Sequence, residues 1–116
     1  MSPAGIDALF ADYVAAWSEP DAVARQRLLE AVWYEAGAYT DPISQASNRA
    51  ELDAIIARFL GENPGAAFTV AGKIDHHHSY VRFFWTLRFA SGAEMSGMDY
   101  GEVSPDGKLI KIVGFF

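Results

Sequence analysis

The pattern of apolar residues changes from helical to strand-like about halfway along the chain. In residues 4–17 the apolar positions recur at steps of three and four, as on one face of a helix. A second helix is expected to begin near Pro20, since proline suits an early helical position, and to run to about residue 33. A third helix should follow Asn48, with Glu51 three positions later as in a capping box, and should end at a cluster of Gly, Asn and Pro.

The second half of the chain has a period of two, which predicts β-strands. Four strands are expected, and the short separators between them favour antiparallel neighbours. These strands cover residues 67–75, 79–90, 93–104 and 108–116. In the second strand the alternate positions from Val81 to Phe89 are all apolar and should face the core. The other positions mix arginine with aromatic residues, as at Arg82 and Phe84, which favours an outer face with a dimer contact.

Helices followed by an antiparallel sheet predict an α+β fold. The 116 residues fit a single domain, 1–116, and an apolar share of 51% is sufficient for an ordinary core. Glycines inside the strands often mark bulges or bends, so the sheet should curve around the helices as a cone and leave a cavity between them. The glycines concerned are Gly72, Gly97, Gly101 and Gly114.

Charge and cysteine content narrow the possible functions. The formal net charge is −6, which argues against nucleic acid or an anionic membrane as a partner, because both require clustered Lys and Arg. There is no cysteine, so neither a thiolate nucleophile nor a Cys-ligated zinc is expected. We see no signal peptide and no apolar run close to the ~18 residues of a membrane span. A soluble cytoplasmic protein is therefore expected.

Three consecutive histidines, His76 to His78, raise the question of a metal site. Consecutive residues in a strand point to alternate sides and do not converge on one ion, so we expect a hairpin turn and no bound metal. His78 could still face the cavity as an acid–base group. The sequence has no nucleophile elbow, phosphate loop or dinucleotide motif, so neither covalent catalysis nor a nucleotide cofactor is indicated.

Two aspartates and a tyrosine are candidates for chemistry. Asp41 ends a short strand-like run before a proline, where partial exposure to solvent would keep it ionised; the alternative is an ordinary turn. Asp99 alternates with Met95 and has no basic residue in the five positions before it. Burial would therefore leave Asp99 as a neutral acid that can donate a hydrogen bond. Tyr13 lies on the apolar face of the first helix, where it could equally be a core residue.

The order of these elements resembles the NTF2-like superfamily, in particular its SnoaL-like and ketosteroid-isomerase-like members. The resemblance covers nearly the whole chain. It rests on Tyr13-Val-Ala-Ala-Trp17, Tyr39-Thr-Asp-Pro42, Pro64-Gly65, Val81-Arg-Phe-Phe-Trp85, Gly97-Met-Asp-Tyr100, and Asp106-Gly107 followed by residues 110–116. It implies a cone-shaped barrel with three N-terminal helices packed on a curved, mainly antiparallel sheet around a hydrophobic cavity. The superfamily includes isomerases, cyclases, dehydratases, hydrolases and non-enzymes, so activity must be inferred from the site.

Ketosteroid isomerases have a tyrosine in a Tyr-Val-Ala-Ala setting, an aspartate before a proline and an aspartate on a late strand. Tyr13, Asp41 and Asp99 match these in order. By this resemblance Asp41 would be the base beside a carbonyl, while Tyr13 and protonated Asp99 would donate hydrogen bonds to the enolate oxygen. This implies a cofactor-free isomerase, or a polyketide-cyclase-like enzyme, that acts on a small apolar carbonyl compound. We expect the pocket to be lined by Trp17, Phe59, Val81, Phe83, Trp85, Met95 and Gly97.

Two other functions remain open at this stage. A non-catalytic ligand-binding or dimerisation module could share the fold, with the three polar side chains pointing to solvent or the cavity filled by aromatic residues. An epoxide-hydrolase-like enzyme would need an arginine between two carboxylates. The outward alternation of Arg82 and Arg88 argues against that arrangement.

Overall fold

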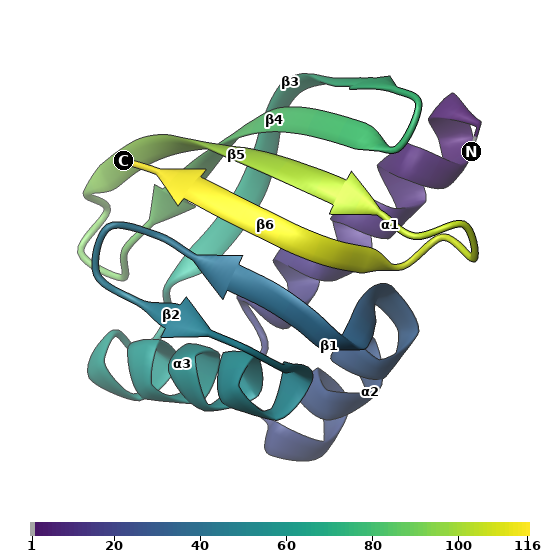
Figure 1. Cartoon of the computed structure of the whole chain (residues 1–116). Helices are drawn as coiled ribbons and strands as arrows, with labels where there is room; N and C mark the ends of the chain where they lie inside the picture. The colour runs from purple at the N-terminus through teal and green to yellow at the C-terminus, as the bar shows by residue number, and fades with distance from the viewer. Residues whose placement is uncertain (1) are drawn as a thin grey trace.

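The computed structural model describes residues 2–116 as three helices packed against one curved, six-stranded sheet (Figure 1). The α+β class and the order of helices before the long strands agree with the prediction. In chain order the elements are α1 (Pro3–Ala16), α2 (Ala22–Val32), β1 (Trp33–Thr40), β2 (Gln45–Ala46), α3 (Arg49–Glu62), β3 (Ala67–His77), β4 (Tyr80–Arg88), β5 (Glu94–Val103) and β6 (Leu109–Phe115).

Polar caps define where the second and third helices begin. The Asp21 carboxylate accepts the backbone N–H of Ala24 at 2.9 Å, so Asp21 caps α2 and Pro20 lies before the helix rather than in its first turn. Asn48 caps α3 as predicted, because its side-chain oxygen accepts the N–H of Glu51 at 2.9 Å. The capping signals therefore place these helix starts more accurately than the proline does.

The sheet is mixed and open. Its strand order is β2-β1-β6-β5-β4-β3, and four of its five pairings are antiparallel, as expected for most of the sheet. The exception is β1, which runs parallel to β6. The strands β2 and β3 lie at the two edges of the sheet and do not pair with each other, so the sheet does not close into the expected barrel. The short strand-like run before Asp41 predicted a strand but could not identify its partner, which is the last strand of the chain.

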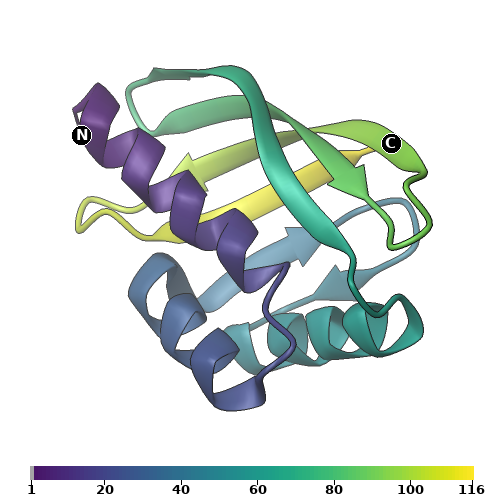
Figure 2. The same cartoon turned by 180° about the vertical axis from the view of Figure 1, so that it is seen from behind.

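A bulge in β3 accounts for much of the curvature. Gly72 has a φ of +75°, and the register between β3 and β4 shifts between Ala71 and Asp75. A glycine with positive φ is well suited to a bulge, where the strand bends and twists more strongly. The bend expected at Gly72 is therefore confirmed. Figure 2 shows β3 sweeping across the sheet toward α1 and the end of α3.

Two element boundaries differ from the prediction. Trp33 is the first residue of β1 rather than the last of α2; its indole is fully buried and donates to the Gly37 carbonyl at 3.2 Å. The strand β3 continues through His77, which pairs with Tyr80, so the turn begins only at His78. Apolar burial at Trp33 and cross-strand pairing at His77 thus override the local signals. Among residues 2–116 no three potential metal ligands converge.

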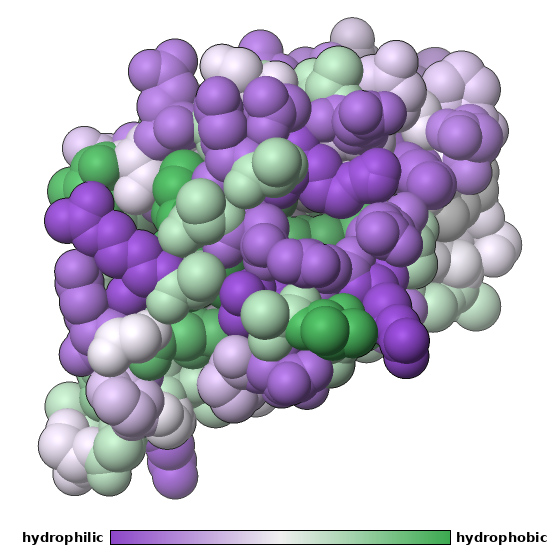
Figure 3. Space-filling view, turned by 90° about the horizontal axis from the view of Figure 1, so that it is seen from below, coloured by the Kyte–Doolittle hydropathy of each residue, from purple (hydrophilic) through white to green (hydrophobic). Residues whose placement is uncertain are grey.

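The alternation of β4 is as predicted. One face of the strand is buried, and the other is largely exposed. The buried residues are Val81, Phe83, Trp85 and Leu87, whereas Tyr80, Arg82, Phe84 and Arg88 are exposed. The outer surfaces of α2 and α3 are largely hydrophilic with small, separate apolar patches (Figure 3), so their apolar residues mainly face inward. In the described part of the chain, no helix is long and apolar enough to cross a membrane.

A buried ion pair connects α2 to α3. Arg25 is 4% exposed, and its side chain donates through Nε to the Asp53 carboxylate at 2.6 Å. Its Nη1 also donates to the carbonyl of Glu19 at 3.0 Å, just before α2. Because guanidinium is always charged, loss of either partner would leave a charge in a poorly solvated place. This pair therefore fixes the relative position of two helices below the sheet.

We expect the Arg25→Gln variant to lower the free energy of unfolding by about 3 kcal/mol, because it leaves the Asp53 carboxylate without its buried partner. Urea denaturation followed by tryptophan fluorescence would measure this. The matched control is Arg58→Gln, which removes an exposed pair with Glu62 on α3 and should cost about 0.5 kcal/mol or less. Equal effects of the two variants would contradict a structural role for the buried pair.

Candidate functional site

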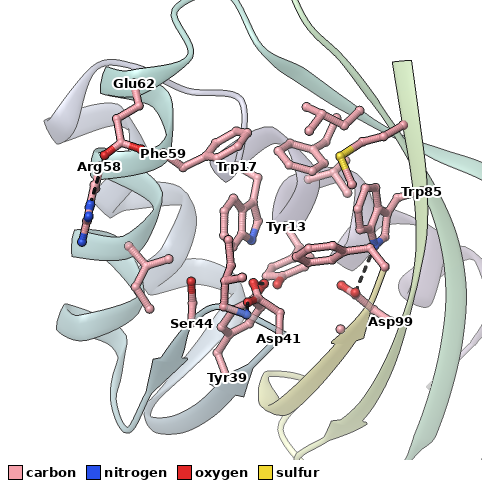
Figure 4. Close-up of a pocket in the computed structure, with 18 of the residues that line it drawn as sticks. Tyr13, Trp17, Tyr39, Asp41, Ser44, Arg58, Phe59, Glu62, Trp85 and Asp99 are labelled. Carbon is pink, nitrogen blue, oxygen red and sulfur yellow. Dashed lines mark hydrogen bonds and ion pairs between the residues drawn. The ribbon is translucent and has the colours of Figure 1, made fainter. Parts of the chain in front are cut away.

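A pocket of about 450 Å³ lies between α1, α3 and the sheet (Figure 4). Its wall is mostly aromatic. The aromatic lining consists of Trp17, Phe59, Phe68, Phe83, Trp85, Phe89 and Phe116, with the two tyrosines described below. The polar groups gather at one end, where Tyr13, Tyr39, Asp41 and Asp99 lie, whereas Arg58 and Glu62 lie on α3 away from them. An apolar pocket with a few convergent polar groups is typical of small-molecule sites.

Most of the residues expected to line the pocket do so. Trp17, Phe59, Phe83, Trp85 and Met95 form part of its wall. Val81 and Gly97 do not. Val81 is 2% exposed and packs in the core beneath the sheet, and Gly97 is covered by the indole of Trp85. Alternation places the strand residues of this set on one face of the sheet, but the bulk of neighbouring side chains decides which of them reach the pocket.

Asp99 is one of two buried charged or polar residues in the described chain, with 7% exposure. It lies on β5 opposite Phe83 of β4, on the face that alternation predicted. The indole N–H of Trp85 donates to its Oδ1 at 3.0 Å. Burial raises the pKa of Asp99 to about 7, although the Trp85 hydrogen bond lowers it and the charge of Asp41 raises it further. About half of the Asp99 carboxyl is then neutral at pH 7 and can donate a hydrogen bond.

The Tyr13 hydroxyl is buried without a hydrogen-bond partner among residues 2–116. Its ring stacks on Trp33 at 5.8 Å between centroids and meets Phe83 edge-on at 6.4 Å, so the side chain is held firmly. Burial, and next the charge of Asp99, raise the pKa of Tyr13 well above its usual value, although the nearby Trp17 indole, which does not meet hydrogen-bond geometry, lowers it. Tyr13 is therefore a fixed, protonated donor at the polar end of the pocket. Unsatisfied buried polar groups are rare and require an explanation.

Asp41 both opens a turn and lines the pocket. Its carboxylate accepts the N–H of Ile43 at 2.9 Å, and its own N–H donates to the carbonyl of Ser44 at 3.0 Å. The other carboxylate oxygen accepts the hydroxyl of Tyr39 at 2.5 Å. These two donors orient the carboxylate, while an ionised carboxylate has about four acceptor positions in all. Acceptor positions thus remain on Asp41 for a proton from a ligand.

Gly114 allows the two acids to approach each other. It lies on β6 directly opposite Asp99. A Cβ atom at Gly114 would be 3.0 Å from the Asp99 carboxyl and 3.3 Å from Cβ of Asp41. The side chains of Asp41 and Asp99 therefore border the same small space over the backbone of Gly114, which has no side chain to fill it. The sequence singled out Gly114 only as a possible bend, because its spatial neighbours depend on the parallel pairing of β1 with β6.

Sequence reasoning did not identify Tyr39 as a site residue. Tyr39 is 6% exposed, packs beside Trp17 at 5.6 Å between ring centroids, and donates to Asp41. Burial raises the pKa of Tyr39 far above its usual value, so the hydroxyl stays protonated. One signal was available, because residues two apart in a strand share a face and Tyr39 precedes Asp41 by two.

Other candidate groups lie outside this pocket. Arg82 and Arg88 are on the outer face of β4, where they pair with Asp75 at 2.9 Å and with Glu94 at 3.2 Å. Neither arginine lines the pocket, as the outward alternation predicted. His78 lies in the β3–β4 turn and contributes to a separate surface depression. The chemistry at the polar end of the pocket therefore rests on the carboxyl and phenol groups of Tyr13, Tyr39, Asp41 and Asp99.

Comparison with solved structures identifies similar proteins. A proposed isomerase of the SnoaL-like family from Agrobacterium tumefaciens strain C58 is 31% identical, with a TM-score of 0.87 over 93% of each chain. An NTF2-like protein of unknown function from Exiguobacterium sp. 255-15 is 13% identical, with a TM-score of 0.72 over 91% of this chain and 95% of that chain. A proposed hydroxylase from Streptomyces galilaeus is 18% identical, with a TM-score of 0.69 over 97% of this chain and 79% of that chain. The last two similarities show the fold alone. No protein-family model and no curated protein sequence matches the chain.

The buried Asp99 carboxyl predicts that stability falls as pH rises from 3.8, its ordinary pKa, to about 7. Between these values the unfolded chain has released the proton that the folded protein still holds, so rising pH favours unfolding; above pH 7 the penalty is constant. Relative to Asp99→Asn, the free energy of unfolding of the wild type should fall by up to about 4 kcal/mol across this range. Urea denaturation of both proteins at several pH values would measure the difference. A difference that does not depend on pH would contradict the raised pKa.

Proposed function

The chain belongs to the SnoaL-like family of NTF2-like proteins, and we propose that it is an enzyme that transfers a proton, without a cofactor, on a small apolar carbonyl compound. Asp41 is the base, and Tyr13 and neutral Asp99 are the hydrogen-bond donors to the substrate oxygen. The natural substrate would be a ketosteroid-like or polyketide-like compound, because the pocket wall is mostly aromatic.

One observation supports this proposal most strongly. Tyr13, Asp41 and Asp99 border one apolar pocket, and the Tyr13 hydroxyl has no partner among residues 2–116. A buried donor without a partner costs free energy, and a ligand oxygen at this position would remove that cost. The neutral form of Asp99 would be a second donor to the same oxygen. Such a pair is typically worth a few kcal/mol when negative charge develops on the oxygen.

The reaction can be written with ordinary proton transfers. Asp41 takes a proton from the carbon beside the carbonyl, and the C–H electron pair becomes the carbon–carbon double bond of an enolate. Tyr13 and Asp99 donate hydrogen bonds to the enolate oxygen. Asp41 then returns the proton to the carbon at the far end of the dienolate, which converts a β,γ-unsaturated ketone into the conjugated enone. The Tyr39 hydroxyl and the Ile43 N–H orient the base for both steps.

A non-catalytic ligand-binding or dimerisation module is the alternative function. It is compatible with the same pocket, since the aromatic wall and the free Tyr13 hydroxyl would also suit a bound ketone that does not react. The two functions differ only in whether Asp41 removes a proton. A kinetic measurement therefore separates them, whereas a binding measurement does not.

We expect the protein to form a conjugated enone from a β,γ-unsaturated ketosteroid, followed by its absorbance, faster than buffer does. The Asp41→Asn variant should lose about 10²–10⁴-fold in kcat, because an amide cannot accept the proton. The matched control is Asp75→Asn, which removes an exposed carboxylate on the outer face and should leave the rate unchanged. If the wild type is no faster than buffer, the isomerase proposal fails and the binding module is favoured.

We also propose that the outer face of the sheet forms a homodimer contact. Phe84 and Phe115 are 53% and 54% exposed, and both pair with Met98, so the three side chains form one apolar row across β4, β5 and β6. Tyr80 is also exposed and stacks on Tyr100 at 6.4 Å between centroids. Contiguous exposed apolar residues of this kind favour contact with another protein surface.

The Phe84→Glu variant should shift the protein from dimer to monomer in sedimentation velocity experiments, because two facing copies would bury the new carboxylates. Val23→Glu is the control; Val23 is 58% exposed on α2, away from this face, and its replacement should leave the dimer intact. A wild type that sediments as a monomer at all concentrations would contradict the proposed contact.

A further inference from the structure

The indole of Trp85 packs against the backbone of Gly97 on the neighbouring strand. Trp85 of β4 pairs directly with Gly97 of β5. A Cβ atom at Gly97 would be 2.1 Å from Cζ2 of the indole and 2.6 Å from two further ring atoms. No other residue type leaves this space. Gly97 therefore permits one specific position of the Trp85 ring, quite apart from any bend in the strand.

The other surroundings of the indole restrict it further. Phe68 of β3 packs edge-on against it at 5.4 Å between centroids, and the side chain of Trp85 is only 7% exposed. In this position the indole N–H meets Oδ1 of Asp99 at 3.0 Å. Asp99 and Gly97 share one face of β5 because they are two residues apart. The ring and the acid are therefore positioned by the same strand.

This contact has a chemical consequence for neutral Asp99. An indole N–H can only donate a hydrogen bond, so the oxygen that faces it must accept. A neutral carboxylic acid has one accepting carbonyl oxygen and one hydroxyl. The carbonyl oxygen is the stronger acceptor of the two, so the indole N–H favours Oδ1 as the carbonyl oxygen and the proton on Oδ2, which has no hydrogen-bond partner among residues 2–116. That hydroxyl is free to donate to a ligand in the pocket that Asp99 lines.

We propose that Trp85, in the space left by Gly97, is a positioning residue that keeps the Asp99 proton on Oδ2 and so directs it toward the substrate oxygen. The inference rests on the proposed function, in which Asp99 is a hydrogen-bond donor. Without the indole N–H, the proton could occupy either oxygen, and the acid would spend part of its time in a form that cannot donate to the substrate.

The same hydrogen bond affects the titration of Asp99. The indole N–H lowers the pKa of Asp99, against the larger effect of burial. The ionisable groups that face Asp99 are Tyr13 on α1, Tyr39 on β1 and Asp41 directly after β1. The two tyrosines stay protonated, so Asp41 is the one neighbouring charge that acts on the titration. Loss of the Trp85 donor should therefore move the Asp99 midpoint to higher pH.

Nuclear magnetic resonance can test this link without any substrate. With ¹³C-labelled aspartate carboxyls and ¹⁵N-labelled indole, the Trp85 N–H and the Asp99 carboxyl of the wild type should titrate together, near pH 7. In Trp85→Phe the Asp99 midpoint should rise. Gly97→Ala should have the same effect, because the added methyl group displaces the ring; if that variant does not fold, Trp85→Phe decides the question.

Gly101→Ala is the matched control for the glycine variant. Gly101 is on the same face of β5, and its Cβ would be 2.7 Å from Cδ1 of Ile112, yet none of its three nearest contacts is Trp85. The control should lower stability and leave the Asp99 midpoint unchanged. The inference is overturned if the indole resonance does not change while Asp99 titrates. It is also overturned if Trp85→Phe leaves the Asp99 midpoint where it is in the wild type.

Enone kinetics separate this inference from the proposed function. In Trp85→Phe, kcat should fall about 10- to 100-fold from misdirected hydrogen bonding while KM stays within about twofold, and the activity should extend to higher pH. A purely structural role would lower stability without moving the pH midpoint. If the wild type forms no enone but the coupled titration is observed, the proposed function fails and the assignment of the proton to Oδ2 is supported.

Discussion

The Asp99 carboxyl is buried among aromatic side chains, and its one hydrogen-bond partner among residues 2–116 is the Trp85 indole N–H. Ionising it costs free energy that one neutral donor offsets only in part, so the pKa rises to about 7. In the proposed mechanism this desolvated group supplies a neutral acid that lines the same pocket as Tyr13 and the oriented Asp41 carboxylate. Without its burial, Asp99 would be ionised at neutral pH and would repel any developing oxyanion.

The fold brings these groups together from distant parts of the chain. The strand β5 holds Asp99 between β4 and β6, and the parallel pairing of β1 with β6 brings Asp41 to the same end of the pocket. Gly114 leaves room for both acids. The helix α1 then supplies Tyr13, and α3 covers the pocket from the other side. Strand register and glycine placement therefore matter more to the site than any loop does.

Periodicity predicted whether a residue faces the core or the solvent, but not which residues it contacts. The alternation of β5 correctly predicted that Asp99 lies on the inner face, and the helical spacing of apolar residues correctly predicted that Tyr13 is buried. The parallel partner of β1 was not predictable, because a short strand between helices does not reveal its neighbour. For the same reason the contact of Trp85 with Gly97, and the ion pair of Arg25 with Asp53, required three-dimensional structure. The local sequence pattern predicts which residues are buried, whereas the site depends on contacts between elements that are far apart in the sequence.

In the proposed mechanism Asp41 removes a proton from a carbon beside a carbonyl while the two donors stabilise the resulting enolate. Deuterium exchange tests this most directly and does not require the natural substrate. A small apolar cyclic ketone such as 1-tetralone would be incubated with the protein in D₂O, and loss of the proton signal beside the carbonyl would be followed by nuclear magnetic resonance. We expect the wild type to exchange this proton well above the buffer rate, and we expect Asp41→Asn to lose that excess. Exchange at the buffer rate by wild-type protein that demonstrably binds the ketone would contradict this mechanism.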